Sequence, residues 1–189
     1  MFRGLYDCFC HWYRGGNIWL YSDPHFADDE MKYIRKNYVG DDEQVRRINS
    51  KVGKKDTIIF LGDIGDQDFM RDIRGYKVLV MGNHDKGVKN YIECFDEVYE
   101  GPIMINNKIM LSHERVDLPF IYSIHGHNHS DIMPKTASHL NVCAELIDYT
   151  PISLLTVLKE GWASKVDDIH RQTIDKAKEK SQDRENGND

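Results

Sequence analysis

Seven side chains of types that bind metal ions occur along the chain, most of them directly after a short apolar run. They are Asp23, His25, Asp63, Asn83, His113, His127 and His129. The carboxyl ends of strands in an open α/β sheet lie along one edge, so residues distant in sequence can meet there. Carboxylate, imidazole and amide groups together suit Mn²⁺, Fe²⁺ or Zn²⁺ better than Mg²⁺, which prefers oxygen ligands. These residue types and positions predict a transition-metal site at a sheet edge.

The spacing of these residues supports that prediction. Asp23 and His25 are two residues apart, as are His127 and His129. Two residues at this spacing point to the same side of an extended segment. A glycine also precedes three of the motif positions, where the backbone must turn sharply or crowd a site: Gly62, Gly82 and Gly126.

The first half of the chain alternates between apolar runs and helical stretches. Short apolar runs that suit strands buried on both faces are Asn17–Ser22, Thr57–Leu61 and Lys77–Met81. Helical stretches with acidic first turns are Asp28–Tyr38 and Asp41–Val52. This alternation predicts an α/β fold built on a layered, largely parallel sheet.

The pattern changes in the second half, where we expect antiparallel strands. Asn106-Asn107 is a plausible hairpin turn between Ile103–Ile105 and Lys108–Ser112. Further strands are expected at Phe120–Ile124 and Leu140–Ile147, and Thr150-Pro151 should start a helix.

The sequence predicts one domain over residues 1–161, followed by an amphipathic helix and a tail. Apolar residues recur from Trp162 through Val166 and Ile169, so residues 162–181 should form a helix packed on the domain. The polar residues 182–189 should form a flexible tail.

Composition indicates an intracellular, cytoplasmic protein. No apolar run approaches the roughly 20 residues needed to cross a bilayer, and charged residues interrupt the first 16 residues where a signal peptide would be apolar. Cys8, Cys10 and His11 lack a second ligand pair at zinc-finger spacing, so reduced thiols are the favoured interpretation of the cysteines. The net charge of −6 argues mildly against a dedicated nucleic-acid binder.

The motifs together resemble those of the calcineurin-like metallophosphoesterases. That pattern is matched by Asp23-Pro24-His25, Gly62-Asp63, Gly82-Asn83-His84-Asp85, His113 and Gly126-His127-Asn128-His129. The resemblance extends from about Asn17 to Leu155 and implies two mixed β-sheets packed as a sandwich and flanked by helices. This implied fold agrees with the strands expected above.

The resemblance also implies a ligand set for two divalent ions. One ion would be held by Asp23, His25, Asp63 and His129, and the other by Asp63, Asn83, His113 and His127. Asp63 would bridge the two. His84 would act as the general acid on the leaving-group side, with Asp85 orienting its ring.

The expected activity is hydrolysis of a phosphoester by a metal-bridging hydroxide that attacks phosphorus in line. Two cations about 3.5–4 Å apart make such a hydroxide available near neutral pH and neutralise phosphoryl charge. The short intervals between motifs leave no room for a cap domain, so we expect a small or nucleotide-like phosphodiester or phosphomonoester as substrate. Nucleic acid is a possible but less favoured partner, and no membrane partner is expected.

Two other functions and two further histidines are left open by the sequence. The same fold serves as a non-catalytic metal-binding interaction scaffold, although the intact motifs favour an enzyme, and a nuclease is the other alternative. His125, which precedes Gly126, would support a ligand or contact substrate rather than bind metal. His139 is expected to be an ordinary histidine near a strand.

Overall fold

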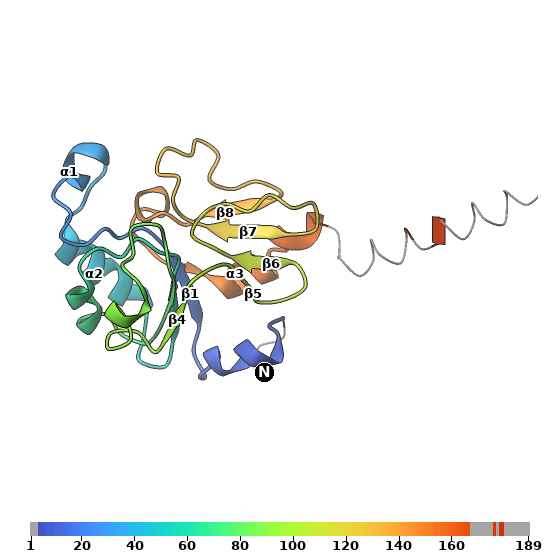
Figure 1. Ribbon diagram of the computed structural model, residues 1–189, viewed down its shortest axis with the longest axis horizontal. Coiled ribbons are helices and arrows are strands. Elements are labelled where there is room, and N and C mark those ends of the chain that lie inside the picture. The colour runs from blue at the N-terminus through green and yellow to red at the C-terminus, as the bar shows by residue number, and fades with distance from the viewer. Residues whose placement is uncertain (1–3, 167–175, 177, 180–189) are drawn as a thin grey trace, which may run out of the picture.

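A computed structural model of the chain describes residues 4–166, 176 and 178–179. Its first sheet has five strands in the order β4-β3-β2-β1-β9 (Figure 1). The bounds are β1 Ile18–Tyr21, β2 Thr57–Phe60, β3 Tyr76–Val80, β4 Glu97–Tyr99 and β9 Ile152–Ser153. Strands β1 to β4 pair in parallel, and β9 runs antiparallel to β1. This sheet is therefore mixed, with its motif-bearing strands parallel.

The second sheet has four strands in the order β5-β6-β7-β8. The bounds are β5 Ile103–Met104, β6 Ile109–Leu111, β7 Tyr122–His125 and β8 His139–Asn141. The hairpin between β5 and β6 is antiparallel, as its Asn-Asn turn predicts, whereas β6, β7 and β8 pair in parallel. The expectation of an antiparallel second half is thus correct only for this hairpin and for β9.

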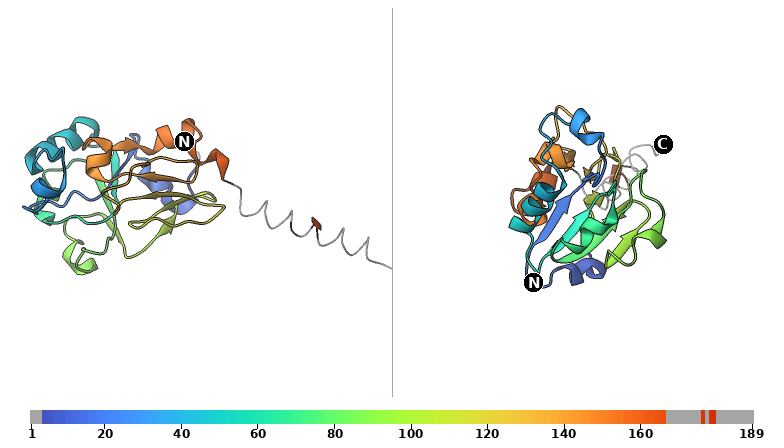
Figure 2. Two further views of the ribbon diagram at one scale, coloured as in Figure 1. Left: turned by 90° about the horizontal axis from the view of Figure 1, so that it is seen from above. Right: turned by 90° about the vertical axis from the view of Figure 1, so that its left-hand side faces the viewer.

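Helices flank the sandwich, as the turned views in Figure 2 show. The α-helices are α1 Met31–Ile34, α2 Asp41–Lys51 and α3 Leu154–Lys159. Short 3₁₀ helices are η1 Asp7–Trp12, η2 Gln67–Arg71, η3 Val88–Asn90, η4 Ala144–Ile147 and η5 Trp162–Lys165. Helix α2 packs on the outer face of the first sheet, whereas α3 and η5 pack on the cluster between the sheets. The fold is the expected α/β sandwich of two mixed sheets flanked by helices.

The alternation of side chains along β1 shows how two cores form. Ile18 and Leu20 lie in the cluster between the sheets, with residues of β6 and β7 such as Leu111 and Ile124. Tyr21 belongs to the cluster on the outer face, where Ile48 of α2 packs. Since both faces of the first sheet are buried, its strands are continuously apolar, as observed in the sequence.

The helix expected over Asp28–Tyr38 is much shorter in the structure. Only Met31–Ile34 is α-helical, and it buries Met31 while Tyr33 and Ile34 are exposed, so little apolar surface supports a longer helix. Arg35 ends the helix in an extended conformation, and its guanidinium donates a hydrogen bond to the backbone oxygen of Asp23. Contacts between Arg35 and the loop after β1 thus replace further helical turns.

Two further boundaries differ from expectation near the end of the domain. The segment Leu140–Ile147 is a strand only to Asn141, and its last residues form η4. The helix expected from Thr150-Pro151 begins later, at Leu154, because Ile152 and Ser153 first pair with β1. Sheet pairing therefore overrides the helix-start signal.

The chain after residue 161 begins by packing on the sandwich core. Ala163 and Val166 are buried in the cluster between the sheets, and Trp162 packs against it. Most of the helix expected over 162–181, and the tail over 182–189, lie outside the described residues. None of the helices among the residues described has the length and apolar character required to cross a bilayer.

Val166 provides a test of this packing. Val166→Ala removes two buried carbon groups at about 0.8 kcal/mol each, so the free energy of unfolding should fall by about 1.5 kcal/mol. Lys165→Ala, at an exposed neighbouring position, is the control and should change stability little. Urea unfolding of both variants measures the difference, and equal stabilities would show that the segment does not contribute to the core.

Candidate metal centre

The carboxyl ends of strands in both sheets lead directly into the expected ligands. Asp23, Asp63 and Asn83 follow β1, β2 and β3, whereas His113 and His127 follow β6 and β7. Three of these turns place non-glycine residues at positive φ: Asp23 (55°) and His25 (47°) after β1, Asp63 (54°) after β2 and His127 (66°) after β7. Such conformations are uncommon and concentrate at functional sites, because the surrounding structure must stabilise them.

One cluster of ligand atoms surrounds Nε2 of His113. This nitrogen lies 2.8 Å from Oδ1 of Asn83, 3.1 Å from Nδ1 of His127 and 3.3 Å from Oδ2 of Asp63. Asp63 and His113 are buried, while Asn83 and His127 are exposed. The cluster is therefore anchored in the protein and open to solvent on one side.

The hydrogen bond on the other side of the His113 ring shows that this cluster fits a cation. Nδ1 lies 2.8 Å from the backbone oxygen of Leu61. Because a carbonyl oxygen only accepts, Nδ1 carries the ring proton, and Nε2 of the neutral ring has a lone pair. That lone pair faces the oxygens of Asn83 and Asp63, so a cation or a proton must lie among them.

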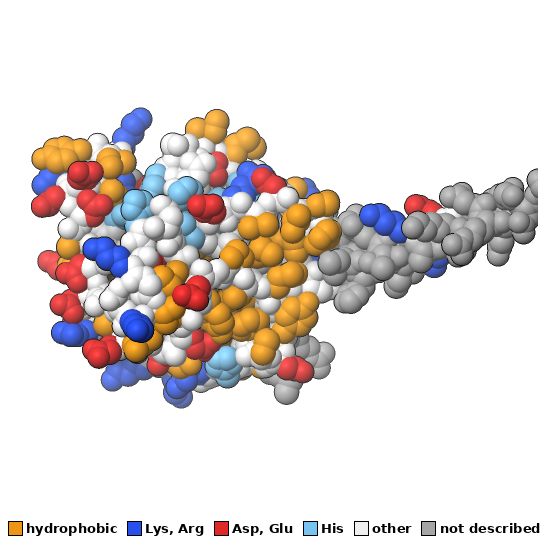
Figure 3. Space-filling view, in the orientation of Figure 1, with side chains coloured by type: hydrophobic (Ala, Val, Ile, Leu, Met, Phe, Trp, Pro, Cys, Tyr) orange, Lys and Arg blue, Asp and Glu red, His pale blue; other side chains and the backbone are white. Residues whose placement is uncertain are grey.

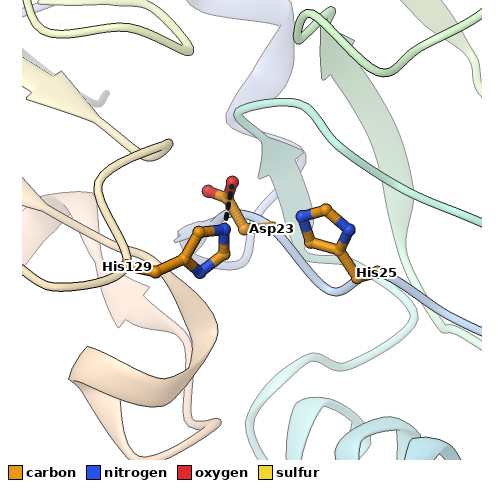
Figure 4. A group of neighbouring side chains, drawn as sticks. All are labelled: Asp23, His25 and His129. Atoms are coloured by element: carbon orange, nitrogen blue, oxygen red, sulfur yellow. Dashed lines mark ion pairs between the residues drawn. The ribbon is translucent and has the colours of Figure 1, made fainter. Parts of the chain in front are cut away.

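The second cluster consists of Asp23, His25 and His129, whose side chains point toward one another in Figure 4. Nε2 of His129 lies 3.5 Å from Oδ1 of Asp23. Oδ1 of Asp23 and Nε2 of His25 are buried and lack a hydrogen-bond partner among the described residues. Unpaired buried polar atoms are costly, and a metal ion bound between these side chains would satisfy them.

Asp63 joins the two clusters. Its Oδ2 lies 3.3 Å from Nε2 of His113 and 3.7 Å from Nε2 of His25. Its Oδ1 accepts a hydrogen bond from the backbone nitrogen of His84. The structure thus brings all seven expected residues together, with one buried carboxylate between the two groups.

Electrostatics at this carboxylate follow from its neighbours. Burial acts to lower the pKa of His113, but the hydrogen bond to Asp63 and nearby carboxylates outweigh it and raise the pKa to about 9. Burial acts to raise the pKa of Asp63, but His113 lowers it overall. The same carboxylates that raise the pKa of His113 would also attract a bound cation.

His84 and Asp85 occupy different surroundings. His84 is exposed, with its ring centroid 5.9 Å from that of His25, beside the clusters. Asp85 accepts hydrogen bonds from the backbone nitrogens of Gly82, Asp63 and Ile64 and from the hydroxyl of Tyr91. These bonds join the loops after β2 and β3, and among the described residues no hydrogen bond links the Asp85 carboxylate to the His84 ring.

Comparisons with known proteins agree with this geometry. The family model described as calcineurin-like phosphoesterase matches residues 16–181, which is most of the chain. The chain belongs to this family. Members of the family act on phosphoester substrates and typically bind divalent metals, and the Asp and His clusters described above could hold such ions.

Similar proteins include one curated sequence and two solved structures. An uncharacterized protein of Methanocaldococcus jannaschii, MJ1445, is 30% identical, with 75% of this chain and 89% of that protein covered. A protein of unknown function from Aquifex aeolicus, AQ665, has a TM-score of 0.65 at 24% identity, over 76% of this chain and 98% of that one. The nuclease MPE of Pseudomonas putida has a TM-score of 0.45 at 17% identity, over 62% and 64% of the chains. The structural similarity to the Aquifex aeolicus protein supports the fold.

Glu145 is a residue of the candidate site that the sequence motifs do not reveal. Its Oε1 lies 2.5 Å from Nδ1 of His129, and its Oε2 lies 3.3 Å from Nε of the buried Arg35. A carboxylate on the far nitrogen of a ligand histidine fixes the orientation of the ring and raises its basicity. No motif marks Glu145, because it comes from η4 and meets His129 only in the folded chain.

Close backbone approach explains the glycine before His127. A Cβ at Gly126 would overlap the side chains of Ser22 and Asp23. Oδ2 of Asp23 accepts hydrogen bonds from the hydroxyl of Ser22 and from the backbone nitrogen of His127. Glycine thus allows the loop after β7 to pack directly against the side chain of Asp23.

An open cleft of about 890 Å³ lies beside the clusters and is bordered by His25, His84 and His129. Its charged lining is mainly acidic, because Lys86 is accompanied by four carboxylates: Asp28, Asp29, Glu30 and Asp66. Figure 3 shows histidine side chains gathered in one area of this face, with acidic side chains nearby. Small molecules can therefore reach the clusters from solvent.

The contact between Glu145 and His129 predicts a specific loss of metal affinity. Glu145→Ala should weaken metal binding by about 10–100-fold, the usual effect of removing a partner of a ligand histidine. Glu145→Gln should lose less metal affinity, because its amide oxygen can still accept a hydrogen bond from the ring N–H of His129. Glu100→Ala, at an exposed position, is the control. Competition with a fluorescent chelator measures the affinities, and an Ala variant equal to the control would refute the role of Glu145.

Proposed function

We propose that the chain is a phosphoester hydrolase that uses two divalent transition-metal ions. Mn²⁺ is the first candidate, and Fe²⁺ and Zn²⁺ are the alternatives, because the ligand set mixes imidazole, carboxylate and amide groups. The observation that carries the proposal is the position of Asp63 Oδ2, which faces His113 on one side and His25 on the other.

Each cluster would hold one ion. Asp23, His25 and His129 would bind the first, and Asn83, His113 and His127 the second, with Asp63 shared between them. When bound, two such ions activate water and neutralise charge on the phosphoryl oxygens. The unpaired Asp23 and His25 atoms and the lone pair of His113 support this assignment.

His84 is the proposed general acid. It lines the cleft beside His25 and is exposed, so its ring can approach a leaving-group oxygen without displacing protein atoms. Proton donation by such a group typically contributes about 10²–10⁴-fold to the rate. Asp85 would act indirectly by fixing the loops that carry Asp63 and His84, since it accepts hydrogen bonds from the backbone nitrogens of Asp63, Ile64 and Gly82.

The cleft supports a small phosphodiester or phosphomonoester, including a nucleotide-like one, as the substrate class. Four carboxylates and one lysine line it, and such a lining repels the repeated phosphates of a long nucleic acid. The described cysteines are all free thiols, which supports a cytoplasmic setting.

Two substitutions separate the proposed metal ligand from the proposed acid. Asp63→Ala removes the group shared by both clusters, so metal content and hydrolysis should fall together. His84→Ala should keep the metal content of the unaltered chain but lose about 10²–10⁴-fold in turnover. Metal analysis and steady-state kinetics on Mn²⁺-loaded protein measure both quantities.

The leaving group provides the control within that experiment. The loss of turnover in His84→Ala should be smaller for a substrate with a nitrophenolate leaving group, which needs little protonation. It should be larger for a substrate with an alkyl alcohol leaving group. A His84→Ala variant that lost its metals would identify His84 as a ligand. An unaltered, metal-loaded chain without phosphoesterase activity on any substrate of either class would favour the non-catalytic scaffold.

A further inference from the structure

A third cluster of ligand-type side chains lies outside the seven-residue set. It contains His125 at the end of β7, His139 at the start of β8 and Asp131 from the loop between these strands. One ligand atom from each lies within 4.8 Å of the others, as is also the case for Asp23, His25 and His129. The cluster shares no residue with the proposed phosphoesterase centre.

The cluster belongs to a buried polar face of the second sheet. The register places Ser123 opposite His139 and His125 opposite Asn141, and all four residues are at most 2% exposed. Their alternating neighbours, such as Ile124, belong to the apolar core between the sheets. Buried polar groups are costly unless they have strong partners, so this face requires an explanation.

Hydrogen bonding at His125 leaves a lone pair directed at His139. Nδ1 of His125 lies 2.8 Å from the backbone oxygen of Gly126, so it carries the ring proton. Nε2 then bears a lone pair and lies 3.0 Å from Nδ1 of His139. This separation matches the 3.1 Å between His113 and His127 in the centre described above. Either a proton or a metal ion can occupy such a space.

Asp131 and the adjoining cleft favour the metal ion. A hydrogen bond between two neutral imidazoles needs no carboxylate, yet Asp131 is held beside both rings. Its Oδ1 accepts from the backbone nitrogen of Met133, and its Oδ2 lies 3.5 Å from Nδ2 of Asn141. A cleft of about 490 Å³ bordered by His125 and Asp131 offers a path for an ion and space for water ligands.

We propose that His125, Asp131 and His139 bind a third divalent transition-metal ion. Two imidazoles and one carboxylate, with further positions open to water, suit Zn²⁺, Fe²⁺ or Mn²⁺. The ion would join β7 and β8 to the loop of residues 126–138. That loop carries His127 and His129, so the third ion would hold two ligands of the neighbouring centre in place.

Metal counting on the full chain tests the proposal. After loading with Zn²⁺ and removal of free ions, elemental analysis should find three ions per unaltered chain and two in His139→Ala. Asp63→Ala should retain the third ion while losing ions from the neighbouring centre. Asp117→Asn, an exposed acidic position on another loop, is the charge-matched control and should retain all three.

A second variant covers the risk that removing the buried His139 ring unfolds the chain. Asp131→Asn keeps the side-chain shape at a half-buried loop position and should lower the affinity for the third ion at least tenfold. Titration with Co²⁺ should show a third saturable d–d absorption component that Asp131→Asn weakens and Asp117→Asn preserves. Two ions in the unaltered chain, or an Asp131→Asn variant with three ions of unchanged affinity, would overturn the proposal.

Discussion

The carboxylate of Asp63 lies between two imidazoles, His25 and His113, with only 2% of the residue exposed. A buried carboxylate is destabilising unless cations or donors surround it, and here they come from both sheets. His25 follows β1, Asp63 itself follows β2, and His113 follows β6. Because this one group draws together residues from both sheets, the relative placement of the sheets is coupled to the candidate metal centre.

Hydrogen bonds and ion pairs around that carboxylate fix the positions of the neighbouring loops and side chains. Asp85 accepts three backbone hydrogen bonds and so joins the loops after β2 and β3. Arg35 and Glu145 link the loop after β1 to the ring of His129. The positive φ of Asp63 and of other residues proposed as ligands indicates that these contacts outweigh local backbone preference.

The motifs and strand ends were predictable because they depend on local patterns: an apolar run, a glycine and then a polar ligand. Predictions failed where tertiary contacts decide the outcome. The helix expected at Asp28–Tyr38 is short because Arg35 turns toward Asp23, and β9 forms because an edge of β1 is available. Glu145 carries no motif at all, and its role arises only when η4 packs beside His129.

A crystal structure of the Mn²⁺-loaded chain, with anomalous diffraction used to locate the metal, tests the central claim most directly. Two anomalous peaks are expected about 3.5–4 Å apart on either side of the Asp63 carboxylate. One peak should contact Asp23, His25 and His129, and the other Asn83, His113 and His127. A single peak in this region, or two peaks that do not share Asp63, would contradict the account.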